Sequence, residues 1–389
     1  MNPNIETLLH EIGPCLSSQV VERLSRSGLS AEAARKRVSR ATGNVRRLTG
    51  IRFPNREAFL FLNNQFGKPE FFEQLASALK ETGSSYGRAL IGLAAREGAV
   101  PVMQFPVATG LPVENAKGQV PHFFVEQKLI ELGLIIRNPS PDGDVISLCD
   151  CSTKNDRRHA TVLVEDIVLG ALKVWLAKVG WSSSKALAVR SDGSLPKFGQ
   201  FRWDLVGPCY LASIVRYNAG KLVNGFIVGD ILLNREITLE DLHPFFAKWD
   251  VLRNQNRATR FQPMFIADGF TSEALGELRA RGCFVGILTT LFGEDIAKQL
   301  HQLVGVVEHA AAEVKNNPQA VFNLFAKVAK IEGAALNLRG VVLELVIGHL
   351  FNLLGYHIDI RQQVKSEDDR RAEIDVKAIN RREVVWGAS

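Results

Sequence analysis

Two acidic residues near the carboxyl end of the chain, Glu344 and Asp375, are placed where carboxylates can do chemistry. Glu344 is the one acid in the apolar, helix-like run Val341–Gly348, and Asp375 lies in the strand-like run Ala372–Val376. An unpaired carboxylate buried among apolar side chains is costly, so the simplest alternative is that Glu344 lies at the edge of its helix face. If the two carboxylates converge, they can hold Mg²⁺, a hard cation that takes oxygen ligands and lowers the pKa of bound water.

The middle of the chain carries the same order of acids and elements. Asp166 lies in a helical stretch with a glycine four residues later, as Glu344 does, and Asp204 lies in the strand-like run Phe201–Val206. Asp166 and Asp204 are 38 residues apart, and Glu344 and Asp375 are 31 apart. The difference falls in turn-rich sequence, where insertions are tolerated. We interpret the two stretches as an internal duplication; two unrelated α/β segments with generic patterns are the alternative.

A helix acid, a strand aspartate and a strand with an acid-x-lysine sequence form the signature of the PD-(D/E)XK, or restriction-endonuclease-like, superfamily. The C-terminal segment resembles its Mrr-type members over about Leu338–Ser389, and residues 161–290 resemble it loosely. The resemblance implies that Asp375 is the principal Mg²⁺ ligand and Glu344 an auxiliary acid in phosphodiester hydrolysis. It also implies an acid-x-lysine strand just after Trp386, which the chain ends too early to contain. We therefore expect the 389-residue chain to bind DNA and to cleave it poorly.

A different assignment of the motif uses only the C-terminal strands. Asp375 and Lys377 themselves form an Asp-x-Lys sequence, for which Asp359 or Asp369 would be the upstream acid. This assignment leaves the strand-like run 383–386 without a role, and Lys377 could equally point to solvent. We favour the first assignment.

In the central copy the equivalent acids are Asp166, Asp204 and Asp230. Asp230 lies in the strand-like run Gly225–Leu233, and Leu232 stands two residues later, where the motif has lysine. In the motif that lysine orients or deprotonates the attacking water. We therefore expect a degenerate domain that does not cleave and that acts as a scaffold or cradles DNA.

Basic residues concentrate near the amino end. Between residues 23 and 52, nine arginines and lysines face one acid, Glu32, so this segment carries a net charge of +8 against +6 for the whole chain. A helix over Ser17–Ser27, a break at Gly28 and a second helix capped by Ser30 form a helix-turn-helix, followed by a short basic hairpin over residues 44–54. We expect a winged helix that contacts DNA through Arg35, Lys36, Arg37, Arg40, Arg46 and Arg47. A solvated basic face on an ordinary helix is the alternative.

A second unit of the same kind follows, with far fewer basic residues. Helical patterns over Phe71–Lys80, Tyr86–Arg96 and Phe124–Leu132 precede two strand patterns that flank the turn sequence of residues 138–143. We predict a second winged-helix-like domain, for which packing against protein explains the sequence as well as contact with DNA does.

Length and composition set the domain number and the cellular setting. A chain of 389 residues with 46% hydrophobic and 23% charged residues is a folded protein of several domains. Five cysteines without a disulfide framework, no signal-peptide pattern and no apolar run near the ~20 residues of a membrane span predict a cytoplasmic protein.

The expected fold class is mixed, an α-rich winged-helix region followed by α/β restriction-endonuclease-like domains. The expected domains are a winged helix (1–68), a second winged-helix-like domain (69–152), a degenerate nuclease-like domain (158–292), a helical connector (293–335) and the start of a truncated nuclease domain (336–389).

These expectations favour a DNA-binding protein of a restriction or defence-type nuclease. Its expected partner is double-stranded DNA, its cofactor is Mg²⁺ in the C-terminal domain, and further copies or defence-complex subunits are candidate partners. The alternatives are a non-enzymatic DNA-binding regulator or complex subunit that uses nuclease-like folds for packing, and an adaptor whose basic helix is incidental.

Overall fold

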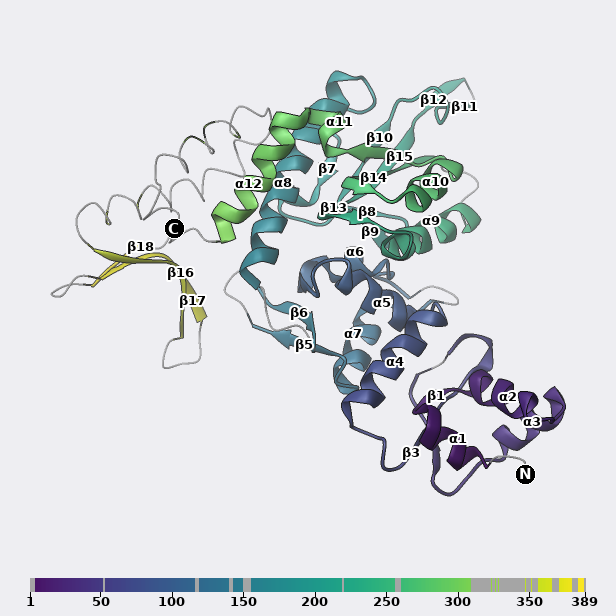
Figure 1. The fold of residues 1–389 in the computed structure, drawn as a ribbon. Coiled ribbons are helices and arrows are strands. Elements are labelled where there is room, and N and C mark those ends of the chain that lie inside the picture. Colours follow the sequence, from purple (N-terminus) through teal and green to yellow (C-terminus); the bar gives the residue numbers. More distant parts are fainter. Residues whose placement is uncertain are drawn as a thin grey trace.

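The computed structural model describes residues 4–51, 53–115, 119–139, 143–149, 155–218, 220–255 and 260–308, together with residues 323, 326, 328, 347, 351, 356–365, 371–379 and 384–387. It is a mixed α/β protein (Figure 1). Two small helix-and-sheet units lead to a larger central sheet with helices on both faces, and a short antiparallel sheet lies near the carboxyl end.

The first unit packs three amphipathic helices on a three-stranded antiparallel sheet of order β1-β3-β2. Its elements are α1 (Ile5–Ile12), β1 (Cys15–Leu16), α2 (Ser17–Arg26), α3 (Ala31–Ser39), β2 (Val45–Arg47), η1 (Pro54–Arg56) and β3 (Phe59–Leu62). The two helices predicted around Gly28 are therefore present. The second hairpin strand is Phe59–Leu62 rather than the expected residues 51–54, because Phe59 and Leu60 are fully buried and pin that strand to the core.

The second unit repeats this strand order, with its sheet running β4-β6-β5. Its elements are α4 (Pro69–Glu81), α5 (Ser85–Ala94), β4 (Ala99–Pro101), η2 (Val102–Gln104), α6 (Phe105–Thr109), α7 (His122–Glu131), β5 (Ile135–Asn138) and β6 (Val145–Leu148). In both units the third strand lies between the first and the second. Strand β4 and helix α6 were not expected from the sequence, since each is too short to show a periodic pattern.

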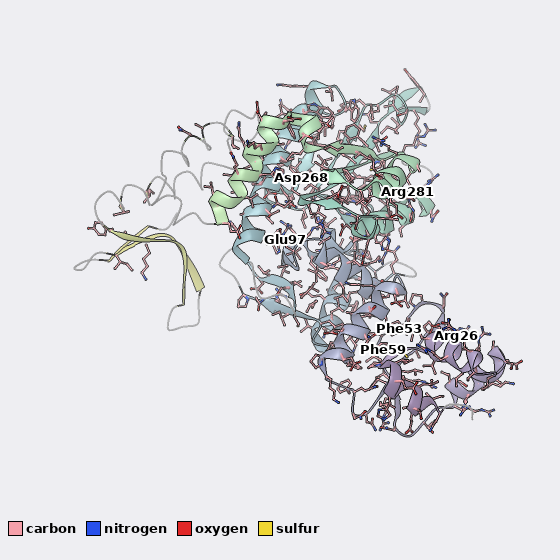
Figure 2. The ribbon with its side chains drawn as sticks, viewed as in Figure 1. Arg26, Phe53, Phe59, Glu97, Asp268 and Arg281 are labelled. Carbon is pink, nitrogen blue, oxygen red and sulfur yellow. The ribbon has the colours of Figure 1, made fainter. Side chains whose placement is uncertain are left out.

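The two units share one apolar core. Phe53 and Phe59 of the first unit stack with ring centroids 6.4 Å apart (Figure 2), and Phe59 meets Phe71 of α4 edge-to-face at 5.7 Å. The same buried cluster continues through α5, α7 and the second sheet. The boundary near residue 68 is thus crossed by continuous packing.

The central body is built on a five-stranded sheet of order β15-β14-β13-β10-β7. Strand β10 is antiparallel to both of its neighbours, whereas β13, β14 and β15 are parallel to one another. The main elements are α8 (Asn155–Lys178), β7 (Ala188–Val189), η3 (Arg190–Asp192), β10 (Leu205–Cys209), β13 (Gly225–Ile237), η4 (Glu240–Leu242), α9 (His243–Gln255), β14 (Phe261–Phe270), α10 (Ser272–Ala280), β15 (Phe284–Ile287), α11 (Leu288–Phe292) and α12 (Glu294–Glu308). Two small hairpins form separate two-stranded sheets. They are β8 (Lys197–Phe198) with β9 (Phe201–Arg202), and β11 (Arg216–Asn218) with β12 (Lys221–Val223).

Helices cover both faces of this sheet. On one face α8 and α12 lie side by side, and Leu172 and Leu303 are buried between them and the strands (Figure 1). On the other face α9 and α10 contribute Phe245, Trp249 and Leu278 to a separate aromatic core. The expected connector therefore begins with a helix, α12, that belongs to the core of the central body. No helix in the described part of the chain has the length and apolar character needed to cross a membrane.

The strand expected over residues 201–206 is divided in two. Strand β9 ends at Arg202 and β10 begins at Leu205, so Trp203 and Asp204 lie between them. Trp203 is fully buried against Phe245 of α9, with ring centroids 6.0 Å apart. Its indole turns into the aromatic core there, which interrupts the strand just before Asp204.

The C-terminal sheet has three antiparallel strands in chain order, β16-β17-β18. They are β16 (His357–Lys365), β17 (Arg371–Ile379) and β18 (Val384–Gly387). Ala378 of β17 is buried in the core that α8 and α12 line. Strand β16 was not expected. Strand β17 contains the predicted strand Ala372–Val376, and β18 covers residues 384–386 of the predicted run 383–386, whose first residue lies outside the described part of the chain.

Two helical glycines should respond to alanine in opposite directions. A Cβ atom at Gly92 of α5 would lie 2.1 Å from the carbonyl oxygen of Ala108, whereas one at Gly276 of α10 would meet nothing within 4 Å. We expect Gly92→Ala to lower the free energy of unfolding by about 1–3 kcal/mol, because α5 and α6 must separate. Gly276→Ala should raise it by about 0.5–1 kcal/mol, because alanine is the better helix former. Urea unfolding of both variants measures the difference, and a neutral Gly92→Ala would contradict the close crossing of α5 and α6.

Candidate functional site

The basic helix α3 is fixed by its apolar face and presents its charges to solvent. The Ser30 hydroxyl accepts a hydrogen bond from the Ala33 N–H at 3.2 Å and caps the helix. Ala34 and Val38 are buried in the core of the first unit. Of the predicted DNA-contacting residues, the exposed ones are Arg35, Lys36, Arg40, Arg46 and Arg47, and Arg37 is half-buried.

Two of these residues already have structural partners. Arg47 donates to the carbonyl oxygens of Val38 and Ser39 at 2.6 and 2.8 Å, and so satisfies the open carboxyl end of α3. Arg46 donates to the side-chain oxygen of Asn63 at 2.7 Å. Arg47 therefore ties β2 to the carboxyl end of α3, and Arg46 ties β2 to the turn that follows β3.

The remaining basic side chains are available to a ligand. Lys36 makes an exposed ion pair with Glu32 at 2.9 Å, which solvent screens and which contributes little. Within the described part of the chain, the side chains of Arg35, Arg37 and Arg40 make no hydrogen bond or ion pair. α3 is thus a rigid helix with three uncommitted guanidinium groups.

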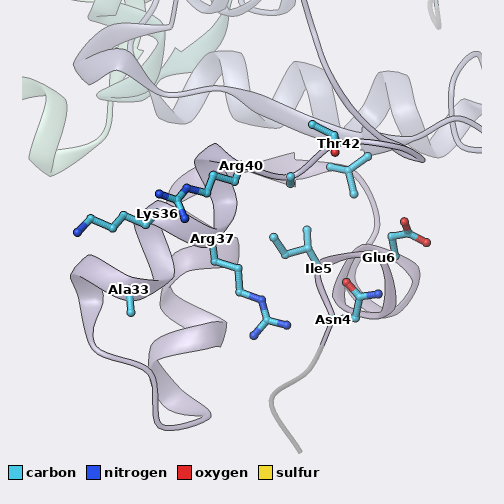
Figure 3. Close-up of a pocket in the computed structure, with 10 residues that line it drawn as sticks. Asn4, Ile5, Glu6, Ala33, Lys36, Arg37, Arg40 and Thr42 are labelled. Atoms are coloured by element: carbon cyan, nitrogen blue, oxygen red, sulfur yellow. The ribbon is translucent and has the colours of Figure 1, made fainter.

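A hollow of about 550 Å³ lies between the amino end of α1 and the carboxyl half of α3. Lys36, Arg37 and Arg40 form one wall of it, and Asn4 and Glu6 form the other (Figure 3). The hollow has three basic groups against one acid, so its charge suits an anion.

The helix that takes the place of α3 in the second unit is α7, and its surface is different. Phe123 and Phe124 are 45% and 49% exposed, and Lys128 is paired with Glu131 at 2.8 Å. The second unit also packs closely on the central body, since a Cβ atom at Gly110 would lie 2.0 Å from a carbonyl oxygen of α9.

A cluster of buried charges lies inside the central body. Its four acids and four bases are Glu165, Asp166, Asp204, Asp230, Arg96, Arg158, Arg190 and Lys248. All are buried except Asp166, whose side chain is 25% exposed. Equal numbers of opposite charges let the cluster exist away from water, because each buried ion needs a partner.

Arg190 binds three carboxylates at once. Its Nε donates to Asp166 at 2.7 Å, its Nη1 to Asp204 at 2.9 Å and its Nη2 to Glu165 at 2.7 Å. The backbone N–H of Arg190 also donates to the carbonyl oxygen of Asp204 at 2.9 Å. Helix α8, the turn η3 and the start of β10 are thereby joined through one guanidinium.

The pKa values in the cluster follow from burial and from these pairs. Burial opposes the charge on Glu165, but the guanidinium groups of Arg158 and Arg190 outweigh it and lower the pKa of this carboxyl. Burial likewise opposes the charge on Arg190, but Asp204, Asp166 and Glu165 raise its pKa well above the usual value. For Asp166, burial wins over Arg190 and raises the pKa. Arg190 is therefore permanently charged, and Glu165 is a permanent carboxylate partner.

The Asp230 carboxylate forms an ion pair with a lysine from a different element. Lys248 of α9 lies 2.5 Å from Asp230 Oδ2 and 3.9 Å from the centroid of the Trp203 ring. Burial raises the pKa of Asp230 to about 6 against the effect of Lys248, and burial lowers the pKa of Lys248. Position 232 holds leucine where the motif has lysine. Lys248, which comes from α9 and not from the strand of Asp230, contacts the Asp230 carboxylate instead.

The predicted central acids come together only in part. Asp166 and Asp204 meet on Arg190, and Asp204 Oδ2 accepts the N–H of Ile231 at 3.0 Å, beside Asp230. The buried helix acid, however, is Glu165, which is fully buried, and not Asp166. Helical spacing could have revealed it, because Glu165 shares the face of Val168, Leu169, Leu172 and Leu176.

Mg²⁺ does not fit this donor set. The acids that would hold it are already paired with Arg190 or with Lys248, so the cation would have to displace a buried guanidinium or ammonium group. Among the described residues no group of histidine, cysteine or acidic side chains is arranged to hold a metal ion.

The predicted C-terminal site is described only through its strands. Glu344 and the alternative acid Asp369 lie outside the described residues. Asp375 lies in β17, the middle strand of its sheet, and the register places Asp359 opposite Lys377. The positions of Asp375 and Lys377 share one face of that sheet, because strand residues two apart do so.

A histidine–aspartate pair lies at the carboxyl ends of the parallel strands. His301 Nδ1 is 2.8 Å from the carbonyl oxygen of Ala297, and its Nε2 is 2.9 Å from Asp268, which Figure 2 labels. Both partners are acceptors, so this arrangement favours the protonated ring, in which both nitrogens donate. The bond to Asp268 accordingly raises the pKa of His301. Asn234 and Arg235 line a cavity of about 480 Å³ beside this pair.

No protein-family model, no curated protein and no solved structure shows significant similarity to this chain.

The His301 pair should make stability depend on pH. The pKa of His301 is raised in the folded state above its usual 6.5, so its stabilising effect is complete below pH 6.5 and is lost as pH rises through the folded pKa. We expect the advantage of the wild type over His301→Gln to shrink between pH 6 and pH 9. The ring is 44% exposed, so solvent screening keeps the effect below about 1 kcal/mol.

Thermal unfolding midpoints of both proteins across this range measure the difference. Asp268, Arg235 and Glu308 are the charged neighbours of the ring. A constant difference between the two proteins would show that His301 is neutral.

Proposed function

We propose that this protein binds double-stranded DNA through α3 of its first unit. The proposal is carried by one observation, the three uncommitted guanidinium groups of Arg35, Arg37 and Arg40 on a capped, packed helix. Basic side chains of this kind neutralise phosphates and release counterions. The order helix, turn, basic helix and two-stranded hairpin supports a winged helix with α3 as the helix that enters the major groove.

The details of the first unit refine which residues would contact DNA. Arg35, Arg37 and Arg40 are the principal candidates, and Lys36 can join them because its pair with Glu32 is weak. Arg46 and Arg47 act chiefly by holding β2 and the end of α3. In this proposal α3 contacts the DNA, and β2 supports α3.

We further propose that the C-terminal segment is part of a Mg²⁺-dependent nuclease domain of a restriction or defence system, with Asp375 as metal ligand and Glu344 as auxiliary acid. In two places an aspartate lies on or just before a strand that is antiparallel to both of its neighbours in the sheet, Asp204 before β10 and Asp375 in β17. This agreement supports the duplication expected from the sequence. In the central body the acids are neutralised by Arg190 and Lys248, so the central copy acts as scaffold in this proposal.

The second candidate function is a non-enzymatic DNA-binding regulator or complex subunit. The observation that favours it is the neutralised central cluster, in which a nuclease-like set of acids has become a packing device. The exposed Phe123 and Phe124 on α7 add an apolar surface suited to a protein partner.

The DNA proposal is tested by changing Arg35, Arg37 and Arg40 together to alanine. Binding of a fluorescent 25-base-pair duplex, measured by anisotropy over a range of salt, should weaken at least tenfold. The slope of log K against log salt should fall by roughly two to three, because up to three phosphate contacts are lost.

A matched control removes the same charge elsewhere. Lys68, Arg279 and Lys298 are exposed on other elements, and their triple alanine variant should bind DNA as the wild type does. Equal affinity of the wild type and the α3 variant would refute the role of α3.

The nuclease proposal is tested on supercoiled plasmid with Mg²⁺. Any Mg²⁺-dependent nicking should be at least a hundredfold slower in Asp375→Asn, because the metal loses its principal carboxylate. Asp295→Asn, on the exposed start of α12, is the control with the same change of charge. Nicking that survives Asp375→Asn would exclude this site.

A further inference from the structure

One buried arginine in the central body is surrounded by three carboxylates. Glu165 and Asp166 come from α8, Asp204 precedes β10, and each accepts one N–H group of Arg190 at 2.7 to 2.9 Å. The guanidinium side chain is 4% exposed. Three carboxylates gathered in such a place require a cation, since unpaired buried charges are expensive.

The carboxylates are held by the protein backbone as well as by Arg190. Asp204 Oδ2 accepts the N–H of Ile231 at 3.0 Å, and Glu165 Oε1 accepts the N–H of Leu233 at 3.3 Å. Both donors belong to β13, in the middle of the central sheet. Two of the three carboxylates, those of Asp204 and Glu165, therefore keep backbone anchors when the guanidinium is removed.

The charge around the position suits a divalent cation. The three carboxylates carry −3, and Arg158, whose Nη2 is 3.4 Å from Glu165, contributes +1 and remains in place. Without Arg190 the group is left with a net charge of −2. Asp166 is 25% exposed, so it gives the position a path to solvent. Carboxylate oxygens are the ligands that Mg²⁺ and Mn²⁺ prefer.

We propose that Arg190 is a built-in cation that replaces a divalent metal ion in a site made by Glu165, Asp166 and Asp204. The wild-type central body then excludes divalent metal, and the removal of this one side chain opens a metal site. The inference concerns the central body alone and needs neither DNA binding by α3 nor a nuclease at the carboxyl end.

The experiment compares the wild type with Arg190→Ala in the full chain. In EDTA the variant should unfold at a lower temperature, because three carboxylates have lost their cation. With 1 mM MnCl₂ its midpoint should rise by about 5 °C, as expected for a ligand that binds only the folded state. Titration followed by the electron paramagnetic resonance signal of free Mn²⁺ should show one more bound ion per chain than in the wild type.

Two controls make the result specific. Arg88→Ala removes another largely buried arginine, whose side chain bonds only to Ser85 Oγ within the described residues, and should give no response to Mn²⁺. The double variant Arg190→Ala/Asp166→Asn should lose the extra ion. An Mn²⁺ response in Arg190→Ala equal to that of Arg88→Ala would overturn the proposal.

A measurement on chains that retain Arg190 covers the case in which Arg190→Ala does not fold. Asp375→Asn removes the candidate ligand at the carboxyl end. This variant should bind no Mn²⁺, so the electron paramagnetic resonance signal of free Mn²⁺ should be the same with and without the protein. Mn²⁺ binding in Asp375→Asn that is lost in Asp375→Asn/Asp166→Asn would show that metal enters beside Arg190, and would overturn the proposal. Neither readout involves DNA, so the failure of the α3 test would leave these outcomes unaffected.

Discussion

The neutralisation of buried charge is the constraint on which the central body depends. Arg190 satisfies acids from α8 and from the start of β10, and Arg158 adds a second contact to Glu165. Removing one member of such a group leaves an uncompensated charge and costs about 3–5 kcal/mol. The same requirement reaches the second unit, since Arg158 also donates to Gln104 at 3.4 Å. The helices, the sheet and the neighbouring unit are therefore positioned by one set of ion pairs as much as by apolar packing.

Part of this arrangement could be predicted from local sequence. Helices α2 and α3 were predicted because Gly28 and Ser30 mark their ends through local chemistry, and β13 because Gly225–Leu233 is an apolar run around Asp230. The place of Asp204 was predicted only approximately, since the burial of Trp203 by α9 interrupts the strand. Lys248 could not be predicted as the partner of Asp230, because that pair exists only once α9 lies across the sheet. Pairs of this kind depend on long-range packing, which no local pattern encodes.

The candidate site at the carboxyl end and the central cluster can be compared strand by strand. Its strands β16, β17 and β18 repeat the antiparallel succession of β7, β10 and β13, with an aspartate on or beside the middle strand each time. In the central body Asp204 is tied to the guanidinium of Arg190, which fixes its geometry. Under the proposed duplication, the same arrangement of strands would carry a structural acid in the central body and a reacting acid at the carboxyl end, and the neighbouring cation would make the difference.

The aromatic packing between the first two units has a mechanical consequence. Phe53, Phe59 and Phe71 form one continuous core across the junction, and Gly110 brings the second unit against the backbone of α9. The chain from α3 to the central sheet therefore contains no free hinge in its described part. A ligand bound by α3, as proposed, would therefore lie at an offset from the central body that this packing sets.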